Sequence, residues 1–175
     1  IDDIEGFKLF DTTITIPANG NIEQNVPLQP FVGYPDEIGY DDGTAENHNA
    51  SFTAGDGWAV KMFLPEGKNS ALVTAGHFRF LDNTYPVPGG TAIQVAIYDA
   101  SGPNGAPGKK LAGPLNATAL RNGEWTVVDL ASEGVIVNGD FYMVYIQQKP
   151  YPYIPALATD TSSPYAGHSW QMVNG

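Results

Sequence analysis

Two neighbouring stretches decide the fold of this chain: YDDGTAEN at residues 40–47 and GWAVKM at residues 57–62. The first is an acidic turn that starts with a tyrosine, and a polar loop connects it to the second. In the second, Trp58, Val60 and Met62 alternate with Ala59 and Lys61. This two-residue period is typical of a β-strand with one buried face. We therefore predict that a β-sandwich begins here.

The alternation recurs at residues 72–80, and further strand-like segments follow at 93–98, 125–130 and 141–146, several of them apolar on both faces at their centres. Each segment has the length of a strand and is bounded by glycine, proline or asparagine. Apolar residues at helical spacing do not persist anywhere for long enough to predict a helix. Clusters of turn-forming residues lie between the segments, at 86–90, 101–108, 121–124 and 138–140. The pattern predicts an all-β fold, an antiparallel jelly-roll-like β-sandwich.

The first 30 residues carry a separate pattern. Residues 12–16 and 22–28 predict two strands around the turn at 17–21, which is an N-terminal β-hairpin extension. We divide the chain into this hairpin at residues 1–30, a linker at 31–37 and the sandwich at 38–175. Two strands alone are marginally stable in water, so the hairpin must pack on the sandwich or belong to a neighbouring domain.

The charge and the composition exclude several classes of partner. The formal net charge is −11, from 8 Lys and Arg against 19 Asp and Glu. An acidic chain without a basic stripe repels phosphate, which argues against nucleic acid and anionic membrane surfaces. No apolar run approaches the roughly 20 residues that cross a bilayer, so we expect no membrane insertion. The chain has no cysteine, and it starts at Ile1 without a signal peptide, as expected for a piece of a longer protein.

The sequence predicts no catalytic residue. It has no Gly-x-Ser-x-Gly elbow and none of the local motifs that surround a subtilisin-type triad. His168 and Ser169 are adjacent, and neighbouring strand residues point to opposite faces. The histidines also lack the spacing of a zinc site, because there is no His-Glu-x-x-His pattern.

An acidic turn is the candidate metal site. Asp41, Asp42 and Glu46 are oxygen ligands of the kind that Ca²⁺ prefers, with Asp56 and Asp140 as further candidates. No Asp-x-Asp-x-Asp-Gly loop is present, so two interpretations stay open: a solvated acidic turn, or a structural Ca²⁺.

Aromatic residues supply the candidate ligand-binding site. Tyr151, Tyr153, Tyr165 and His168 lie in or beside a proline-rich loop at residues 150–167, and Trp170 follows. Aromatic rings with polar neighbours serve as platforms for sugars and peptides. The alternative is that these rings cover one end of the core. Trp58 and Trp125 alternate with apolar neighbours and are predicted to be core residues.

Several motifs together resemble one family. They are YDDGTAE at 40–46, GWAVKM at 57–62, GEWTVVDL at 123–130 with GDFYMVYI at 139–146, and SWQM at 169–172. Residues 36–175 resemble the C-terminal sandwich domain of bacillopeptidase F-like, subtilisin-like serine peptidases of Gram-positive bacteria. The stretch TITIPANGN at 13–21 is similar to the last hairpin of a carboxypeptidase-regulatory-like domain.

The resemblance implies a non-catalytic accessory domain of a secreted or cell-wall-associated peptidase. The catalytic domain would lie elsewhere in the parent hydrolase, and neighbouring domains would be partners. The domain would position the enzyme or bind a protein substrate or the cell envelope. The alternative function is a carbohydrate-binding module that binds polysaccharide through the aromatic loop. Family members continue into a further strand, so residues 14–16 or 22–28 are expected to fill that place here.

Overall fold

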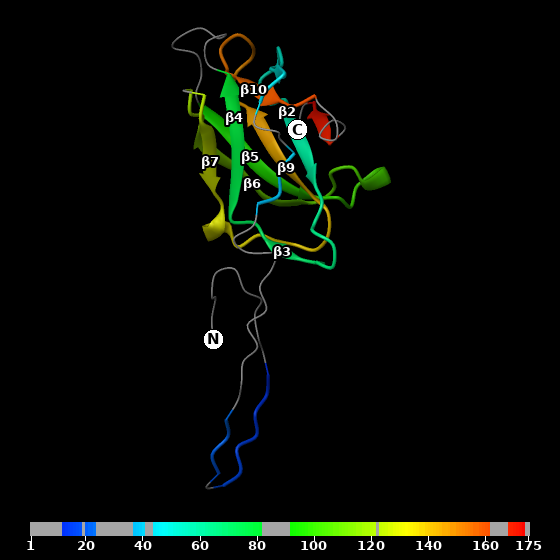
Figure 1. Cartoon of the computed structure of the whole chain (residues 1–175), viewed down its shortest axis with the longest axis vertical. Helices are drawn as coiled ribbons and strands as arrows, with labels where there is room; N and C mark the ends of the chain where they lie inside the picture. The colour runs from blue at the N-terminus through cyan, green and yellow to red at the C-terminus, as the bar shows by residue number, and fades with distance from the viewer. Residues whose placement is uncertain are drawn as a thin grey trace.

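The computed structural model describes residues 12–18, 20–23, 37–40, 44–81, 92–121, 123–161 and 168–173. These residues form an all-β structure of two antiparallel sheets packed face to face (Figure 1). The prediction of an antiparallel β-sandwich is therefore confirmed. Among the described residues, no helix combines the length and the apolar character that a membrane span requires.

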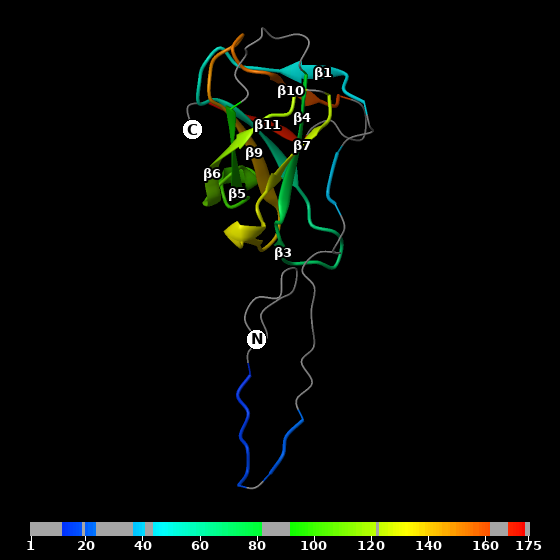
Figure 2. The same cartoon turned by 90° about the vertical axis from the view of Figure 1, so that its left-hand side faces the viewer.

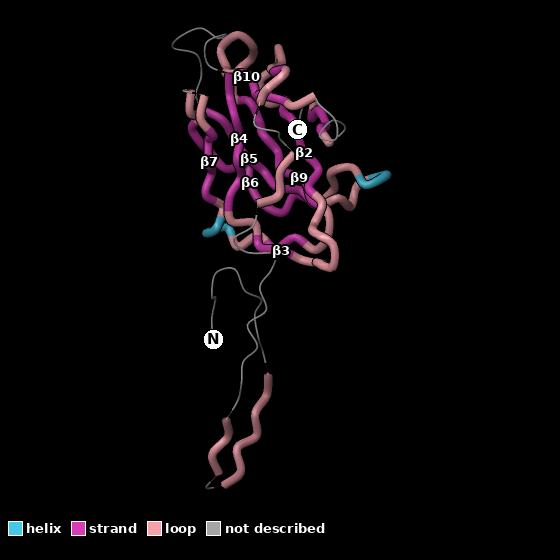
Figure 3. Tube along the Cα trace, viewed as in Figure 1, coloured by secondary structure: helices cyan, strands magenta, loops and turns pink. Residues whose placement is uncertain are grey.

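The larger sheet has five strands in the order β11 (Ser169–Met172), β2 (Gly57–Met62), β9 (Phe141–Gln147), β5 (Ala92–Asp99) and β6 (Lys110–Thr118). The second sheet has four, in the order β1 (Asn47–Asn49), β10 (Ala156–Thr159), β4 (Ala75–Leu81) and β7 (Trp125–Asp129). The short strands β3 (Ala71–Leu72) and β8 (Ile136–Val137) pair at one end of the sandwich. Two short 3-10 helices, η1 (Pro103–Gly105) and η2 (Ala131–Glu133), lie in connecting loops (Figure 3).

The core lies between the sheets, and β9 is its central strand. Phe141, Met143 and Tyr145 of β9 belong to the large cluster between the sheets. Tyr142 and Val144 belong to a second buried cluster that also contains Ala59 and Ala96 of the neighbouring strands. Because both faces of β9 are covered, its sequence is an apolar run and not an alternation.

Close packing of β2 against β9 depends on a glycine. A side chain at Gly57 would place its Cβ 2.2 Å from the carbonyl oxygen of Tyr145. No ordinary contact is that short, so only glycine fits at this pairing position.

The predicted strands at 57–62, 93–98, 125–130 and 141–146 are present, with small shifts at their ends. The single strand predicted at 72–80 divides into β3 and β4. Strand β6 was missed because Gly113 and Pro114 are typical of a turn. Here they form a bulge: the pairing with β5 shifts between Val95 and Ile97, and Gly113 takes a φ of +88°.

The prediction that Trp125 is a core residue is wrong. In β7 the inward side chains are those of Thr126 and Val128, and Trp125 is 40% exposed. The hydroxyl of Thr126 accepts a hydrogen bond from the Leu120 N–H at 2.8 Å, so this polar residue is satisfied inside. Trp58, by contrast, packs partly buried against the core.

The described part of the N-terminal segment forms the predicted turn but no strand. The Gly20 N–H donates to the carbonyl oxygen of Pro17 at 3.0 Å. The described residues 12–18 and 20–23 carry no strand assignment, and Ile14, Ile16 and Ile22 are exposed. Figure 2 shows this segment apart from both sheets, so the expectation that residues 14–16 close a sheet edge is wrong. Residues 24–28 of the other predicted strand lie outside the described residues.

Candidate functional site

Three exposed aromatic side chains gather at one end of the sandwich. Phe52, Tyr151 and Tyr153, which we name the aromatic tip, are all exposed, and Phe52 is 80% exposed. The rings of Phe52 and Tyr151 meet edge to face, with centroids 5.3 Å apart. They belong to the loops 51–56 and 148–155, at the end of the sandwich away from β3 (Figure 1).

The buried amide of Gln147 connects these two loops. Gln147 is the last residue of β9 and has no exposed surface. Its Oε1 accepts the Ser51 N–H at 2.9 Å. Its Nε2 lies within 2.9 Å of the carbonyl oxygens of Ser51, Thr53 and Lys149, so two amide hydrogens serve three acceptors. A buried amide is stable only when it is hydrogen-bonded in this way.

Further hydrogen bonds stiffen the loop at 51–56. The hydroxyl of Ser51 donates to the carboxylate of buried Asp56 at 2.6 Å. The Gly55 N–H donates to the Gln147 carbonyl, and the Gln147 N–H donates to the Asp56 carbonyl, each at 2.9 Å. On the other loop, the Tyr151 N–H donates to the Ser51 carbonyl at 2.8 Å. The backbone that carries the exposed rings is thus held by buried contacts.

The three side chains of the aromatic tip are uncharged, and exposed Lys149 lies in the same loop, 148–155, as the two tyrosines. Residues 51–55 and 150–155 contain no charged side chain, although the whole chain has a net charge of −11. Phenyl and phenol rings offer flat apolar faces, and the tyrosines add a hydroxyl group at the edge. Such surfaces bind sugar rings or extended peptides.

The sequence predicted two of the three tip residues. Tyr151 and Tyr153 lie where the aromatic loop was expected to bind a ligand, and Phe52 was missed. The only local sign was a single phenylalanine in a loop of small polar residues at 49–56. The loop of Phe52 is joined to the loop of the tyrosines by the hydrogen bond between Ser51 and Gln147. These two residues are 96 positions apart, so no local sequence pattern indicates the contact. Tyr165 lies outside the described residues.

The structure does not bring His168 to the tip. Its carbonyl accepts the Lys61 N–H at 2.9 Å, and Lys61 pairs with Tyr142 at the opposite end of β9 from Gln147. The His168 ring stacks on Tyr40, with centroids 4.1 Å apart and planes 7° apart. Phe63 meets the same imidazole edge to face at 5.6 Å. His168 is therefore half of a ring stack that anchors Tyr40 to the sheet.

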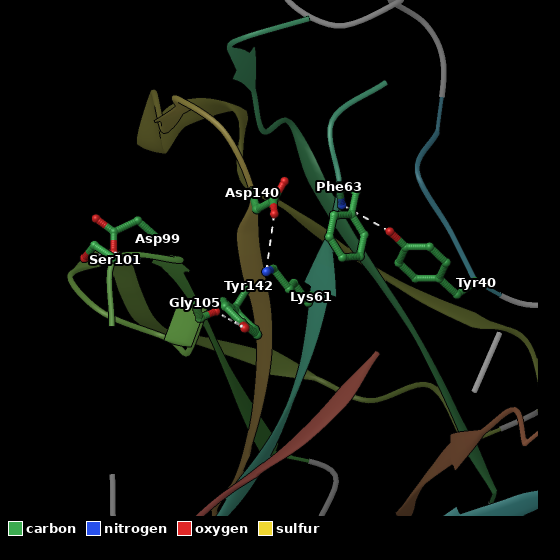
Figure 4. A network of polar contacts seen from close by, with 8 residues as sticks. All are labelled: Tyr40, Lys61, Phe63, Asp99, Ser101, Gly105, Asp140 and Tyr142. Carbon is green, nitrogen blue, oxygen red and sulfur yellow. Dashed lines mark hydrogen bonds and ion pairs between the residues drawn. The ribbon is translucent and has the colours of Figure 1, made fainter. Parts of the chain in front are cut away.

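Polar contacts surround this second cluster (Figure 4). The Phe63 N–H donates to the Tyr40 hydroxyl at 3.1 Å, and burial raises the pKa of Tyr40. Lys61 forms an ion pair with Asp140 at 3.3 Å. The hydroxyl of Tyr142 donates to the Gly105 carbonyl; burial raises the pKa of this tyrosine, and the charge of Lys61 partly opposes the rise. These contacts fasten loops to the sheet.

The acidic turn is only partly described. Asp41 and Asp42 lie outside the described residues, so calcium binding there stays a prediction. The carboxylate of Glu46 accepts hydrogen bonds from the Thr44 hydroxyl at 2.5 Å and the Thr161 N–H at 3.1 Å, which gives it a structural use. Within the described ranges, no three His, Asp or Glu side chains are grouped to hold a metal ion.

The described histidines lie on separate elements. His48 is in β1, and His77 is in β4, where it contacts the carboxylate of Glu37. His168 directly precedes β11, which begins at Ser169, and its ring stacks on Tyr40. His77 thus faces an acid, whereas the carboxylate of Asp56 accepts from a serine hydroxyl in the loop at 51–56.

Comparison with known proteins identifies one relative. No protein-family model and no solved structure matches the chain. The chain is 55% identical over 166 residues to Bacillopeptidase F of Bacillus subtilis (strain 168), and the match covers 95% of this chain. It covers 12% of that protein, so the chain corresponds to a small part of its relative.

Proposed function

We propose that this chain is a non-catalytic accessory domain of a secreted, subtilisin-like bacterial peptidase, and that it holds the enzyme on its target through the aromatic tip. The aromatic tip carries this proposal, because three exposed rings stand on loops held by a fully buried glutamine. The sequence relation to a small part of Bacillopeptidase F supports the peptidase context.

Rigid presentation is what makes the tip suited to binding. Ordering a mobile side chain on association costs about 0.5–1.5 kcal/mol for each one. The backbone at Tyr151 is already fixed through Ser51, and Phe52 and Tyr151 already touch. A ligand that stacks on these rings therefore loses less entropy than it would on free loops. The partner would be a protein substrate or a polymer of the cell envelope.

A second candidate, a carbohydrate-binding module, uses the same surface. The observation in its favour is the lack of charged side chains in residues 51–55 and 150–155. Sugar rings are uncharged, stack on aromatic faces and hydrogen-bond to tyrosine hydroxyls. Under both candidates the domain acts outside the cell or at the cell wall, next to other domains of its parent protein.

Retention on insoluble material separates these candidates. The protein is mixed with cellulose, chitin or purified cell walls, and in parallel with collagen or keratin, and the bound fraction is measured. Retention on polysaccharide that is lost in Tyr151→Ala or Tyr153→Ala supports the carbohydrate module; retention on fibrous protein supports the substrate-binding role. Trp170→Ala is the matched control, since Trp170 is an exposed aromatic residue of β11, away from the tip.

The non-catalytic assignment has its own test. The purified chain is incubated with casein, and release of soluble peptides is followed. We expect no release above the buffer control. Hydrolysis that is inhibited by a serine-directed reagent would overturn the assignment.

A further inference from the structure

Among the described residues, the outer edge of β7 has no strand beside it and lacks a proline or a bulge. Exposed edges are commonly blocked by proline, by a bulge or by shortness. In the described sheets, β6 carries Pro114 and a bulge, β1 has three residues, and β11, the other edge of the larger sheet, has four. Strand β7 has five residues, no proline and unbroken pairing with β4. No described strand lies on its other side, and Figures 1 and 2 show it at the border of its sheet.

The hydrogen-bond phase tells which residues of β7 face the open edge. The Leu130 N–H donates to the Thr74 carbonyl at 2.8 Å, so Leu130 and Thr74 form a hydrogen-bonded pair. Along an antiparallel ladder, hydrogen-bonded pairs alternate with pairs that are not hydrogen-bonded to each other. Asp129, Val127 and Trp125, opposite Ala75, His77 and Arg79, therefore occupy the other positions. Their N–H and C=O groups point away from β4, toward the open edge.

The same three residues also turn their side chains to solvent. Trp125 is 40% exposed and Val127 is 58% exposed, and Asp129 is exposed next to them. Exposed backbone groups and exposed side chains thus coincide at Trp125, Val127 and Asp129. We name these three residues the β7 edge.

The exposed side chains of the β7 edge change from aromatic to acidic along the strand. It begins with an indole, continues with an aliphatic side chain and ends with a carboxylate. Glu133 of η2 follows, so the acidic character increases toward that end. At the other end, exposed Glu124 precedes Trp125, and the guanidinium of Arg79, whose Nε donates to the Gly123 carbonyl at 3.2 Å, supplies a positive charge that offsets it. A complementary strand would be basic at one end and apolar at the other.

We propose that the β7 edge binds an extended peptide segment of a protein partner, which adds antiparallel to β7 as a fifth strand of its sheet. Main-chain hydrogen bonds to Trp125, Val127 and Asp129 hold the segment. In that register every second side chain of the peptide lies beside these three residues. The recognised pattern, read from its N-terminus, is basic–x–aliphatic–x–aromatic.

A second copy of this chain is a poorer occupant. Two chains that each carry a net charge of −11 repel one another at close approach. Antiparallel pairing of two β7 strands about Val127 would also set each Asp129 opposite a tryptophan and leave it without a cation. The charge therefore favours a basic peptide.

Synthetic peptides test the proposal directly. The probe is a fluorescently labelled peptide with the sequence KTVTY between flexible ends, and its binding to the whole chain is followed by anisotropy. N-methylation at the lysine, valine and tyrosine amides blocks the hydrogen bonds to β7 and should weaken binding at least about tenfold. N-methylation at the two threonine amides, which face away, is the matched control and should change it little.

Two protein variants complete the test. Val127→Pro removes an N–H that points to the open edge and spares the ladder to β4, so binding should fall at least about tenfold while the fold is kept. Asp129→Lys should weaken binding of KTVTY and strengthen that of ETVTY, a readout that stands even if the proline variant fails to fold. No binding of KTVTY at millimolar peptide, or equal effects of the two N-methylated peptides, would overturn the proposal. Binding should persist in Tyr151→Ala, which separates it from the function of the tip.

Discussion

Two loop systems of this domain are each organised by one side chain, and they differ in burial and charge. At the tip, the amide of Gln147 is fully buried and bonds the backbone of two loops. At residues 99–109, the carboxylate of Asp99 accepts the Ser101 N–H at 3.1 Å, the Ser101 hydroxyl at 2.5 Å and the Lys109 N–H at 2.7 Å, and it lies at the surface. The first system presents exposed aromatic rings; the second ends in Pro103, Asn104 and Gly105.

The difference indicates which loop is built to keep one shape. Removing a buried hydrogen-bonding group leaves its partners without water, and that penalty is large. When a surface carboxylate is removed, water can hydrogen-bond to its former partners, so the loss of stability is small. The contribution of the carboxylate to stability also depends on pH, because the group titrates. A loop that must present rings in a fixed arrangement thus depends on an uncharged, buried residue. The following variants test this contrast.

Gln147→Ala should give the largest loss of stability. It leaves the Ser51 N–H and the carbonyls of Thr53 and Lys149, which are partly buried, without their partner. We expect a loss of about 2–4 kcal/mol in the free energy of unfolding, measured by urea titration. The matched control is Gln148→Ala. Gln148 bonds only the Gln94 side chain in the described contacts, so its loss should stay below about 1 kcal/mol. Equal losses would contradict the role of Gln147.

Tyr142→Phe should have an intermediate effect that depends on alkaline pH. The hydroxyl holds the Gly105 carbonyl, so the loss near neutral pH should be about 1 kcal/mol. Burial raises the pKa of Tyr142 in the folded state, which means that its neutral form stabilises the fold below the ordinary tyrosine pKa of about 10. This contribution disappears as the pH rises through the folded-state pKa. Unfolding measured from about pH 8 to 11 should show a smaller alkaline loss in the variant than in the wild type.

Asp99→Asn should have a smaller effect that depends on acid pH. The hydrogen bond from the Ser101 hydroxyl, together with those from the Ser101 and Lys109 N–H groups, lowers the pKa of Asp99. Its stabilising contribution is therefore present above the ordinary carboxylate pKa of about 4 and is lost as the pH falls through the lowered value. The melting temperatures of wild type and variant should converge in acid. The deficit of Gln147→Ala involves no titrating group and should persist there.

Phe52→Ala should have the smallest effect on stability. Its side chain is 80% exposed, and its ring meets that of Tyr151 edge to face. We expect a change within about 0.5 kcal/mol by urea titration, because surface substitutions rarely exceed that. A larger loss would mean that the ring supports the loop and is not free to meet a ligand.

The sequence predicted the sandwich because period-two alternation and turn residues are local signals, as at Trp58, Val60 and Met62. It failed where a local signal was ambiguous. Strand β6 was not predicted, because Gly113 and Pro114 within it are residue types typical of turns, and Trp125 has apolar neighbours yet turns outward. Phe52 could not be assigned to the site because its loop meets Gln147 only in the folded state. The acidic turn at Asp41 and Asp42 stays a calcium prediction, testable by a melting-temperature shift at millimolar Ca²⁺.

The central claim is that the aromatic tip binds the target, and one comparison tests it most directly. The triple variant Phe52→Ala, Tyr151→Ala, Tyr153→Ala is measured beside the wild type and Trp170→Ala for retention on whichever insoluble material holds the wild type. The account predicts that retention is lost in the triple variant, is kept in Trp170→Ala, and that all three melt within a few degrees of one another. Undiminished retention by the triple variant would contradict it.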